Sequence, residues 1–342
     1  MNMSKFLLPG LVIVGFVATM AQPAAEMDTK EKFLRPDLKV PVDNKLNAER
    51  INLGKMLFFD PRLSGSNWIS CATCHNPALG WSDGLPKARG NKQKELARAT
   101  PTLVNVAYNR MQMWDGRFRT LEQQALGPIE SPDEMNQNLD ELVTELKAIK
   151  AYEQLFFEAY PGQGITKNTI AKALSSFQRT IVATKAPFDR WVVGDEDAIS
   201  QEAKSGFALF TGKANCAKCH MGFNFVDDGF HNIGLKSNQD EGRFGVRPVK
   251  ISMGAFKTPT LRDIAKTAPY MHNGIYNTLE EVVDHYDRGG DAKGNLSPNI
   301  EPLNLSDKEK ADLVAFLKTL SGESMQVQLP YLPNHYSAQS EF

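Results

Sequence analysis

The stretch ISCATCHNPALGW, residues 69–81, decides how the rest of this sequence is interpreted. It contains Cys71, Cys74 and His75 in the spacing Cys-x-x-Cys-His. The run NCAKCHMGF repeats that spacing at Cys216, Cys219 and His220. The chain has only these four cysteines. Whatever one group does, the other is expected to repeat.

Three chemistries use paired cysteines. Four cysteines in an exported chain would allow two disulfides, and zinc sites usually combine two such pairs within a short stretch. Cys-x-x-Cys-His is instead the attachment signature of c-type haem, in which both thiols bond to the porphyrin and the histidine ligates iron. The two motifs lie far apart in the chain, and each carries its own histidine. They therefore predict two covalent haems, with His75 and His220 as iron ligands.

The N-terminal sequence predicts export. It has one lysine, an apolar run over 6–18 and small residues over 21–25. This pattern is typical of a secretory signal peptide, which we assign to residues 1–25, with an uncleaved N-terminal anchor as the alternative. No other apolar run approaches the roughly 20 residues that a spanning helix needs. We expect a periplasmic protein without stable membrane insertion.

Length and charge narrow the function classes. A chain of 342 residues with 42% hydrophobic content is long enough for two domains. The net charge of -1 gives no indication of nucleic acid as a partner. A local charged patch that docks another protein stays open.

The segments around the motifs predict a mainly α fold with two tandem cytochrome c-like haem domains. A helical lead-in precedes each motif, over 48–61 and 199–214, and apolar residues at helical spacing continue between them. Ser306 and Glu309 form a capping box that starts a C-terminal helix, which Gly322 ends. We place the first haem domain at 40–192, the second at 193–325 and an irregular tail at 326–342.

Four histidines remain beyond the two motifs: His231, His272, His285 and His335. His335 lies in the tail and is expected on the surface. In the helix expected to start at Thr278, Tyr286 shares a face with Leu279 and Val283, so it points towards the core, while His285 tends away from it. From this pattern alone, a buried core tyrosine is the commoner explanation for Tyr286.

Several longer motifs carry a family resemblance. They are LGKMLFFDPRLSGSNWISCATCH, MWDGRFRTLEQQALGPIESPDEM and FKTPTLRDIAKTAPYMHNGIYNTLEEVVDHYDRGG, in this order along the chain. Over residues 45–320 the sequence resembles the bacterial di-haem cytochrome c peroxidase and MauG family. The resemblance implies a peroxide-binding haem in the first domain, facing an electron-transfer haem in the second.

The same resemblance implies roles for single residues. Trp114 falls where the family keeps a tryptophan between the haems, and Gln124 and Glu134 fall where it keeps a distal glutamine and glutamate. A carboxylate there can move a proton from the inner to the outer peroxide oxygen, first as a base and then as an acid. Gln124 would hold the peroxide by a hydrogen bond. His272 aligns with a family histidine near the second haem, where a hydrogen bond to a propionate is expected rather than ligation.

Two departures distinguish this chain from ordinary family peroxidases. Asn91 stands in the loop over 87–102 where those enzymes carry a histidine that caps the first iron. Tyr286 stands where they have a methionine ligand, and MauG-type proteins have tyrosine there. Thioether ligation raises the potential of a haem, whereas a phenolate stabilises its oxidised states. The resemblance implies that Tyr286 ligates the second iron beside His220, and we expect the fully ferric protein to react directly with peroxide.

A third difference concerns calcium. Family members often bind calcium between the domains through an asparagine and two backbone carbonyls. Here the asparagine position is Ala99, and the carbonyls would come from Thr267 and Pro269. A calcium site would need water or Glu95 as a substitute ligand.

These features predict a periplasmic di-haem oxidoreductase that uses hydrogen peroxide. The leading hypothesis is a MauG-like enzyme that oxidises aromatic residues, chiefly tryptophan, of a partner protein through a high-valent di-haem state. One alternative is a cytochrome c peroxidase with a small cytochrome or copper protein as electron donor. Another is a non-catalytic di-haem electron-transfer cytochrome. Homodimers are common in the family, and no segment here argues for one.

Overall fold

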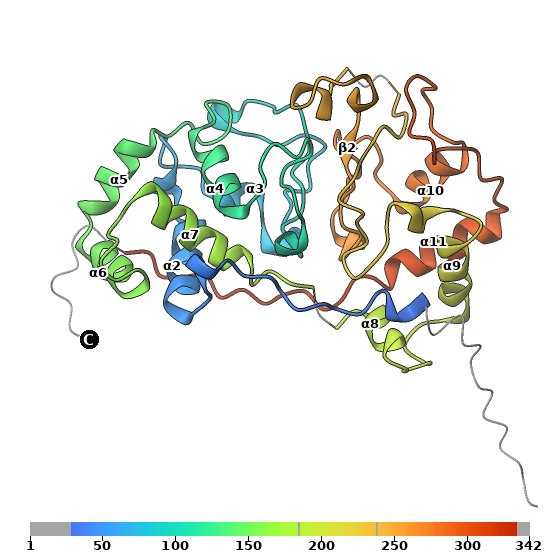
Figure 1. Cartoon of the computed structure of the whole chain (residues 1–342), viewed down its shortest axis with the longest axis horizontal. Helices are drawn as coiled ribbons and strands as arrows, with labels where there is room; N and C mark the ends of the chain where they lie inside the picture. The colour runs from blue at the N-terminus through green and yellow to red at the C-terminus, as the bar shows by residue number, and fades with distance from the viewer. Residues whose placement is uncertain (1–28, 184, 237–238, 334–342) are drawn as a thin grey trace, which may run out of the picture.

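The computed structural model describes residues 29–183, 185–236 and 239–333, and within these ranges the chain is mainly helical (Figure 1). The named strands, β1 (Phe230–His231) and β2 (Phe256–Lys257), pair antiparallel in one small sheet. The prediction of a mainly α fold is thereby confirmed. The predicted signal peptide and His335 lie outside the described residues. Among the described helices, none has the length and hydropathy of a membrane span.

The first motif belongs to a group of six α-helices. These are α2 (Ala48–Phe59), α3 (Cys71–Cys74), α4 (Leu121–Glu130), α5 (Leu139–Lys147), α6 (Lys150–Ala159) and α7 (Lys167–Gln178). Helix α7 contacts both α2 and α4. Their apolar faces close a core that runs from Leu53 to Ala183 along the chain.

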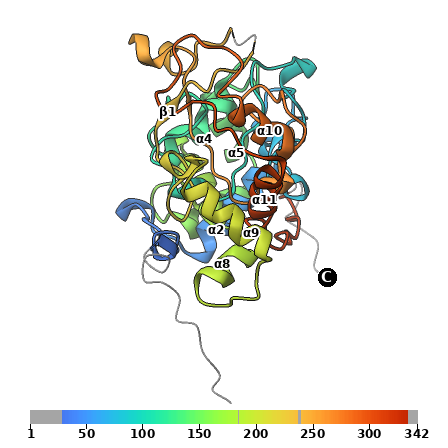
Figure 2. The same cartoon turned by 90° about the vertical axis from the view of Figure 1, so that its right-hand side faces the viewer.

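The second motif belongs to a group of four α-helices. These are α8 (Pro187–Val192), α9 (Gln201–Thr211), α10 (Leu279–Asp287) and α11 (Asp307–Lys318). Figure 2 shows α9 and α11 side by side, and they make the most extensive helix contact in the described chain. The expected capping box of Ser306 and Glu309 starts α11, and Thr278 and Glu281 form the same device at the start of α10.

Short 3₁₀ turns connect the helices. They are η1 (Val42–Asn44), η2 (Pro61–Leu63), η3 (Pro77–Leu79), η4 (Asn91–Gln93), η5 (Val106–Tyr108), η6 (Cys216–Lys218), η7 (Arg243–Gly245), η8 (Lys250–Ser252) and η9 (Ile264–Lys266). The haem motifs therefore project from long, irregular segments that rest on a few helices.

In each domain, a glycine allows two helices to cross at close distance. A Cβ on Gly54 of α2 would lie 1.9 Å from the Ala173 carbonyl oxygen of α7. A Cβ on Gly206 of α9 would lie 2.0 Å from the Asp312 carbonyl oxygen of α11. Only glycine permits both close crossings, because any side chain there would overlap backbone atoms. The two lead-in segments named from the sequence thus perform the same packing role.

The two ends of the described chain cross between the domains (Figure 1). Phe33, near the N-terminal end, packs into the second core against Phe188, Phe207 and Phe225. The C-terminal segment returns to the first domain, where the Pro333 carbonyl oxygen accepts a 2.8 Å hydrogen bond from Arg62. Each domain is therefore completed by residues from the far end of the sequence.

Candidate functional site

The first motif lies on α3. His75 follows directly, and its Nδ1 lies 3.1 Å from the Trp81 carbonyl oxygen. If Nδ1 donates to that carbonyl, Nε2 is left as the ligating nitrogen. All four cysteines are free, so the disulfide alternative does not describe this structure. Burial raises the pKa of Cys71 to about 12 and that of Cys74 to about 11, which keeps both thiols protonated at neutral pH.

A cavity of about 1000 Å³ opens beside this motif. Cys71, Cys74 and His75 line it, together with apolar side chains that include Phe58 and Leu103. Its volume is at the upper end of the range for organic ligand sites. The thiols, the oriented imidazole and the apolar walls fit a covalently attached haem.

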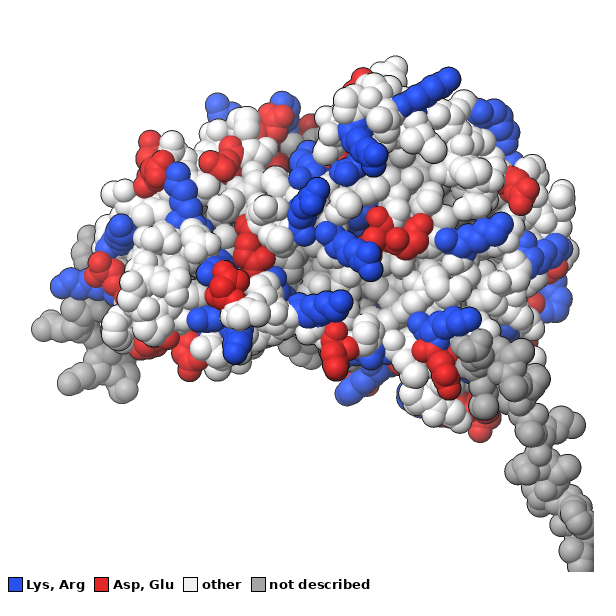
Figure 3. All heavy atoms as spheres, in the orientation of Figure 1, with Lys and Arg blue, Asp and Glu red and all other residues white. Residues whose placement is uncertain are grey.

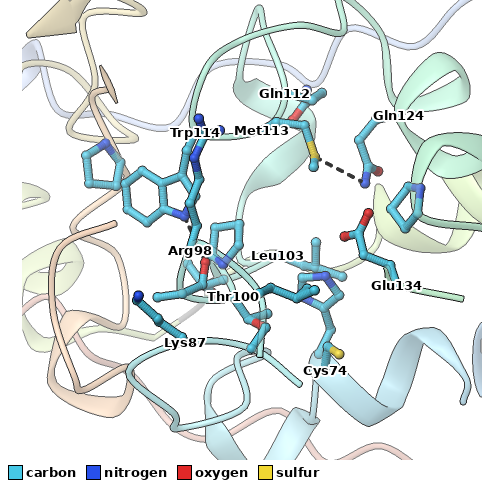
Figure 4. A pocket seen from close by; sticks show the side chains of 18 of the residues that line it. Cys74, Lys87, Arg98, Thr100, Leu103, Gln112, Met113, Trp114, Gln124 and Glu134 are labelled. Carbon is cyan, nitrogen blue, oxygen red and sulfur yellow. Dashed lines mark hydrogen bonds between the residues drawn. The ribbon is translucent and has the colours of Figure 1, made fainter. Parts of the chain in front are cut away.

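Gln124 and Glu134 lie together at one end of the cavity (Figure 4). Gln124 projects from α4, and its Nε2 lies 3.8 Å from the Met113 sulfur. Glu134 follows α4 on a tight turn, where its backbone N–H donates to the Ser131 carbonyl oxygen at 3.1 Å. The structure thus brings a carboxylate and an amide from one helix and its exit turn to the same chamber as His75.

The loop expected to lack a capping histidine is fixed to the turn that carries Glu134. The Asn91 backbone N–H donates to the Asp133 carbonyl oxygen at 2.9 Å, and its side chain donates to the Pro132 carbonyl oxygen at 3.3 Å. Lys94 forms a 2.6 Å ion pair with Asp133. Asn91 is engaged with backbone groups, and other residues of the loop, Ala88 and Gly90 among them, line the chamber without supplying an imidazole.

The second motif repeats the arrangement of the first. His220 Nδ1 lies 2.8 Å from the Phe225 carbonyl oxygen, and burial lowers the pKa of His220 to about 4. Burial also raises the pKa of Tyr286, and the nearby Cys216 and Cys219 thiols raise it further. Tyr286 therefore lies near enough to the second motif for Cys216 and Cys219 to act on its pKa.

His285 is completely buried. The helix pattern turned it away from the core and did not predict what would cover it. Its Nε2 lies 2.9 Å from the Ile233 carbonyl oxygen and its Nδ1 lies 3.0 Å from the Tyr276 hydroxyl. A loop that includes Ile233 covers that side of α10, so both faces of the helix are occupied.

The domains meet at Trp114. Its indole Nε1 donates to the Ala99 carbonyl oxygen at 2.9 Å, and its own carbonyl oxygen accepts from the Lys257 backbone N–H at 2.8 Å. The Trp114 ring lies edge-on to His272, with centroids 6.3 Å apart, and His272 stacks on Phe256. Trp114 therefore contacts the first domain through its indole hydrogen bond, and the second domain through both its ring and its backbone carbonyl.

Comparisons with known proteins agree with this geometry. The di-haem cytochrome c peroxidase family model matches residues 48–197, and a cytochrome c model matches residues 203–321. The methylamine utilization protein MauG of Methylorubrum extorquens is 49% identical over 92% of this chain and 92% of its own. That of Methylophilus methylotrophus is 44% identical over 94% and 98%.

The chain belongs to the di-haem cytochrome c peroxidase and MauG family. It is a di-haem oxidoreductase of two tandem cytochrome c-type domains. A solved MauG-like protein associated with microbial copper homeostasis superposes with a TM-score of 0.80 at 33% identity, covering 86% of this chain and 95% of that one.

Ala99 stands at the position where the resemblance implies a calcium-binding asparagine. The backbone N–H of Ala99 donates to the His272 carbonyl oxygen at 2.7 Å, and its side chain offers no oxygen. Glu95, the suggested substitute, pairs with Arg89 at 2.8 Å. Thr267 and Pro269 line the large cavity, and two carbonyl oxygens would be far fewer than the six to eight oxygen ligands that calcium takes.

Sequence reasoning assigned no role to a polar cluster at the second motif. His231 Nε2 lies 2.7 Å from Asp227, and the ligand atoms of His231, Asp227 and Cys219 lie within 4.8 Å of one another. Because Cys219 belongs to the haem attachment motif, we place this cluster at the edge of the second haem site rather than in a separate metal centre. Its signal in the sequence is weak, since three residues lie between Asp227 and His231 in a segment without regular helix.

Proposed function

We propose that this protein is a MauG-like enzyme that uses hydrogen peroxide to oxidise aromatic side chains, chiefly tryptophan, of a partner protein. Peroxide takes up two electrons and two protons and gives two waters, and the two electrons come from the partner. The observation that carries the proposal is the 49% identity to the methylamine utilization protein MauG of Methylorubrum extorquens. Tyr286 supports it, because it stands where the resemblance places a methionine in ordinary family peroxidases.

Glu134 is the proposed proton-transfer group. Its position in the chamber with His75 suits a base that accepts a proton from one peroxide oxygen and an acid that delivers it to the other. Gln124 offers an amide that would hold the peroxide by hydrogen bonding. The Met113 contact keeps that amide turned into the chamber.

Trp114 is the proposed path for electrons between the domains. The haems supply the redox chemistry when bound, and we propose that Cys71, Cys74, Cys216 and Cys219 hold them covalently. His75 would ligate the first iron, and His220 with Tyr286 the second. Trp114 joins the two domains by one hydrogen bond on each side, so its ring has a fixed position at their junction. His272 packs beside the Trp114 ring and would orient the edge of the second haem.

We propose that the protein works in the periplasm after residues 1–25 have been removed. Covalent haem attachment would take place there, and an exported redox partner would be present. The alternative function is a cytochrome c peroxidase that takes electrons from a small cytochrome or copper protein. This alternative is supported by the matching family model, which is described as di-haem cytochrome c peroxidase. A purely electron-transferring cytochrome is disfavoured by the paired Gln124 and Glu134 side chains in an accessible chamber.

The deciding experiment is an optical and EPR titration of the fully oxidised holoprotein with one equivalent of hydrogen peroxide, without reductant. Rapid loss of both ferric signals with a long-lived oxidised product is the expected result. A protein that reacts only after one haem has been reduced would be an ordinary peroxidase. Six-coordinate signals that do not respond to peroxide in either state would indicate an electron-transfer cytochrome.

A further inference from the structure

One surface loop of the second domain has no role in the function proposed above. It spans residues 243–252, includes η7 and η8, and is called the basic loop below. Its residues 245–251 are all exposed. Arg247 and Lys250 supply charge, and Ile251 is 75% exposed, with Val246 and Val249 also on the surface. Such a combination of exposed aliphatic and basic side chains is unusual on a surface that contacts only water.

Hydrogen bonds tie the basic loop to neighbouring segments. Its ends are held together, since the Arg243 backbone N–H donates to the Ala255 carbonyl oxygen at 2.7 Å. Asn295 donates from its side chain to the carbonyl oxygens of Lys250 and Met253, at 3.1 and 2.9 Å. A compact surface loop with fixed, adjacent ends is a common carrier of function. The apolar side chains are therefore presented in one arrangement, and binding would need little ordering of the loop.

The basic loop is linked to the first domain, which adds the positive charge of Arg119. Arg243 donates to the carbonyl oxygens of Asp115 and Gly116, both at 2.8 Å, so it links the loop to the neighbouring domain. Burial lowers the pKa of Arg243, and the nearby charges of Arg247 and Arg119 contribute to that shift. Arg119 is itself exposed.

The resulting patch joins both domains. Figure 3 shows Lys and Arg side chains gathered over the upper middle part of one face, and Figures 1 and 2 show the loop segment projecting at the top of the molecule. Glu241, at the base of the loop, is an exposed acid in this region. Arg119, Arg243, Arg247 and Lys250 outnumber it.

The patch lies over the inter-domain tryptophan. The two carbonyl groups that Arg243 binds belong to the residues directly after Trp114. Beyond the loop, the chain enters β2, where the Lys257 backbone N–H binds the Trp114 carbonyl oxygen. A protein seated on the basic loop would therefore sit close to the residue that joins the two domains.

We propose that the basic loop and Arg119 form the docking surface for the redox partner, and that the partner presents an acidic rim around a small apolar spot. The inference rests on the function proposed above, which requires a protein as the source of electrons. Charge complementarity selects the partner's sign and speeds encounter. The aliphatic side chains would form the dry centre of the contact.

The test uses the resting ferric holoprotein and no peroxide. Binding is measured by calorimetry at 10 and 200 mM salt with two small redox proteins: plastocyanin, which is acidic, and a basic mitochondrial cytochrome c. A zero-length carbodiimide cross-linker, followed by peptide mass spectrometry, locates the contact. We expect plastocyanin to bind more tightly than the cytochrome at low salt, to cross-link through Lys250, and to lose affinity at high salt.

The variant R247E/K250E should weaken plastocyanin binding about fivefold or more at low salt, because both charges are reversed at the contact. Ile251→Ser should weaken it at both salt concentrations. The matched control K147E/K150E carries the same charge change on exposed lysines of α5 and α6, and should bind as the unmodified protein does.

If R247E/K250E and K147E/K150E weakened plastocyanin binding equally, the net charge of the protein would explain the effect, and the proposal would be overturned. Tighter binding of the basic cytochrome, or cross-links that avoid the basic loop, would do the same. A failure of the proposed function is recognised separately, because it leaves this binding intact and removes only the reaction with peroxide.

Discussion

At the scale of single residues, the two motifs share one way of orienting a ligand. His75 and His220 each place Nδ1 against a backbone carbonyl oxygen a few residues later, at 3.1 and 2.8 Å. Such a hydrogen bond fixes both the tautomer and the ring plane of a metal-binding histidine. The two sites differ in their other residues. Glu134 and Gln124 line the first, whereas Tyr286 lies near enough to Cys216 and Cys219 of the second for them to act on its pKa.

Glu134→Gln should keep the fold and lose proton transfer. Loss of a general acid–base group typically costs about 10²–10⁴-fold in rate. Stopped-flow absorbance after mixing with peroxide measures this loss. Glu130→Gln is the control, because Glu130 is an exposed acid at the end of α4, the helix that precedes Glu134. A Glu134→Gln protein that reacts as fast as this control would remove Glu134 from the proposed mechanism.

At the scale of elements, each domain depends on one close helix crossing and on a few buried polar ties. Gly54 and Gly206 allow the crossings of α2 with α7 and of α9 with α11. Glu122 ties α4 to α7 and to η1, because it accepts hydrogen bonds from Arg179, Ser175 and Asn44. These contacts hold the helices from which Gln124 and the Glu134 turn project.

Gly54→Ala and Gly206→Ala should each destabilise the protein. Alanine favours a helix by about 1 kcal/mol over glycine, but its Cβ would overlap a backbone carbonyl of the neighbouring helix. We expect a net loss of about 1–3 kcal/mol, as for other overpacked sites. Urea unfolding of the holoprotein measures it. Gly294→Ala is the control, since a Cβ there would meet nothing within 4 Å. Two variants as stable as this control would show that the crossings adjust freely.

Glu122→Gln should destabilise the first domain in a pH-dependent way. Burial would raise the pKa of Glu122, but Arg179 outweighs it and the pKa falls from 4.5 to about 2. A lowered folded-state pKa stabilises the fold above the unfolded value, and this contribution is lost as the pH falls from about 4.5 towards 2.

We therefore expect Glu122→Gln to cost about 1–3 kcal/mol at pH 7 and less at pH 3.5. Urea unfolding at both pH values measures the difference from the unmodified protein. Glu130→Gln should show no such trend. A Glu122→Gln penalty that stays the same at both pH values would assign the effect to packing rather than to charge.

At the scale of the whole molecule, the two haem domains are joined by crossing chain ends and by a polar junction. Arg98 of the first domain pairs with Asp240 of the second at 2.7 Å, and with Asp115 of its own domain at 2.7 Å. Trp114 is held within the same junction. The domains are thus fixed relative to each other near the proposed electron path.

Phe33→Ala should destabilise the second domain, although Phe33 precedes the first. Its ring is 1% exposed and packs among three phenylalanines of the second core. Loss of a buried phenylalanine typically costs about 3–5 kcal/mol. Thermal unfolding measures it, with Leu34→Ala as the control because Leu34 is 46% exposed. An unchanged melting temperature for Phe33→Ala would mean that the N-terminal segment is dispensable for the second core.

Trp114→Phe should leave the first domain reactive and slow its communication with the second. The backbone bond to Lys257 remains, whereas the indole N–H and its easily oxidised ring are lost. We expect the peroxide-induced change at the second haem to slow by about tenfold, which corresponds to about 1.4 kcal/mol in the barrier. Stopped-flow spectra that separate the two haems measure it. Equal rates in both proteins would exclude Trp114 from the path.

The sequence by itself determined the features that depend on local spacing. Two Cys-x-x-Cys-His groups predicted two haem sites, and capping residues predicted where α10 and α11 begin. These predictions succeed because the groups concerned lie within one turn of each other along the chain. The family resemblance added Trp114, Gln124 and Glu134, which local patterns alone would have left as core or surface residues.

Only the tertiary structure decided which distant segments meet. It buried His285 under a loop, placed Phe33 in the second core, and set Asp227 and His231 beside Cys219. It also joined Arg243 of the basic loop, by hydrogen bonds, to the two residues that follow Trp114. Helical periodicity identifies an apolar face but not what covers the opposite face, because that depends on contacts between residues far apart in the chain.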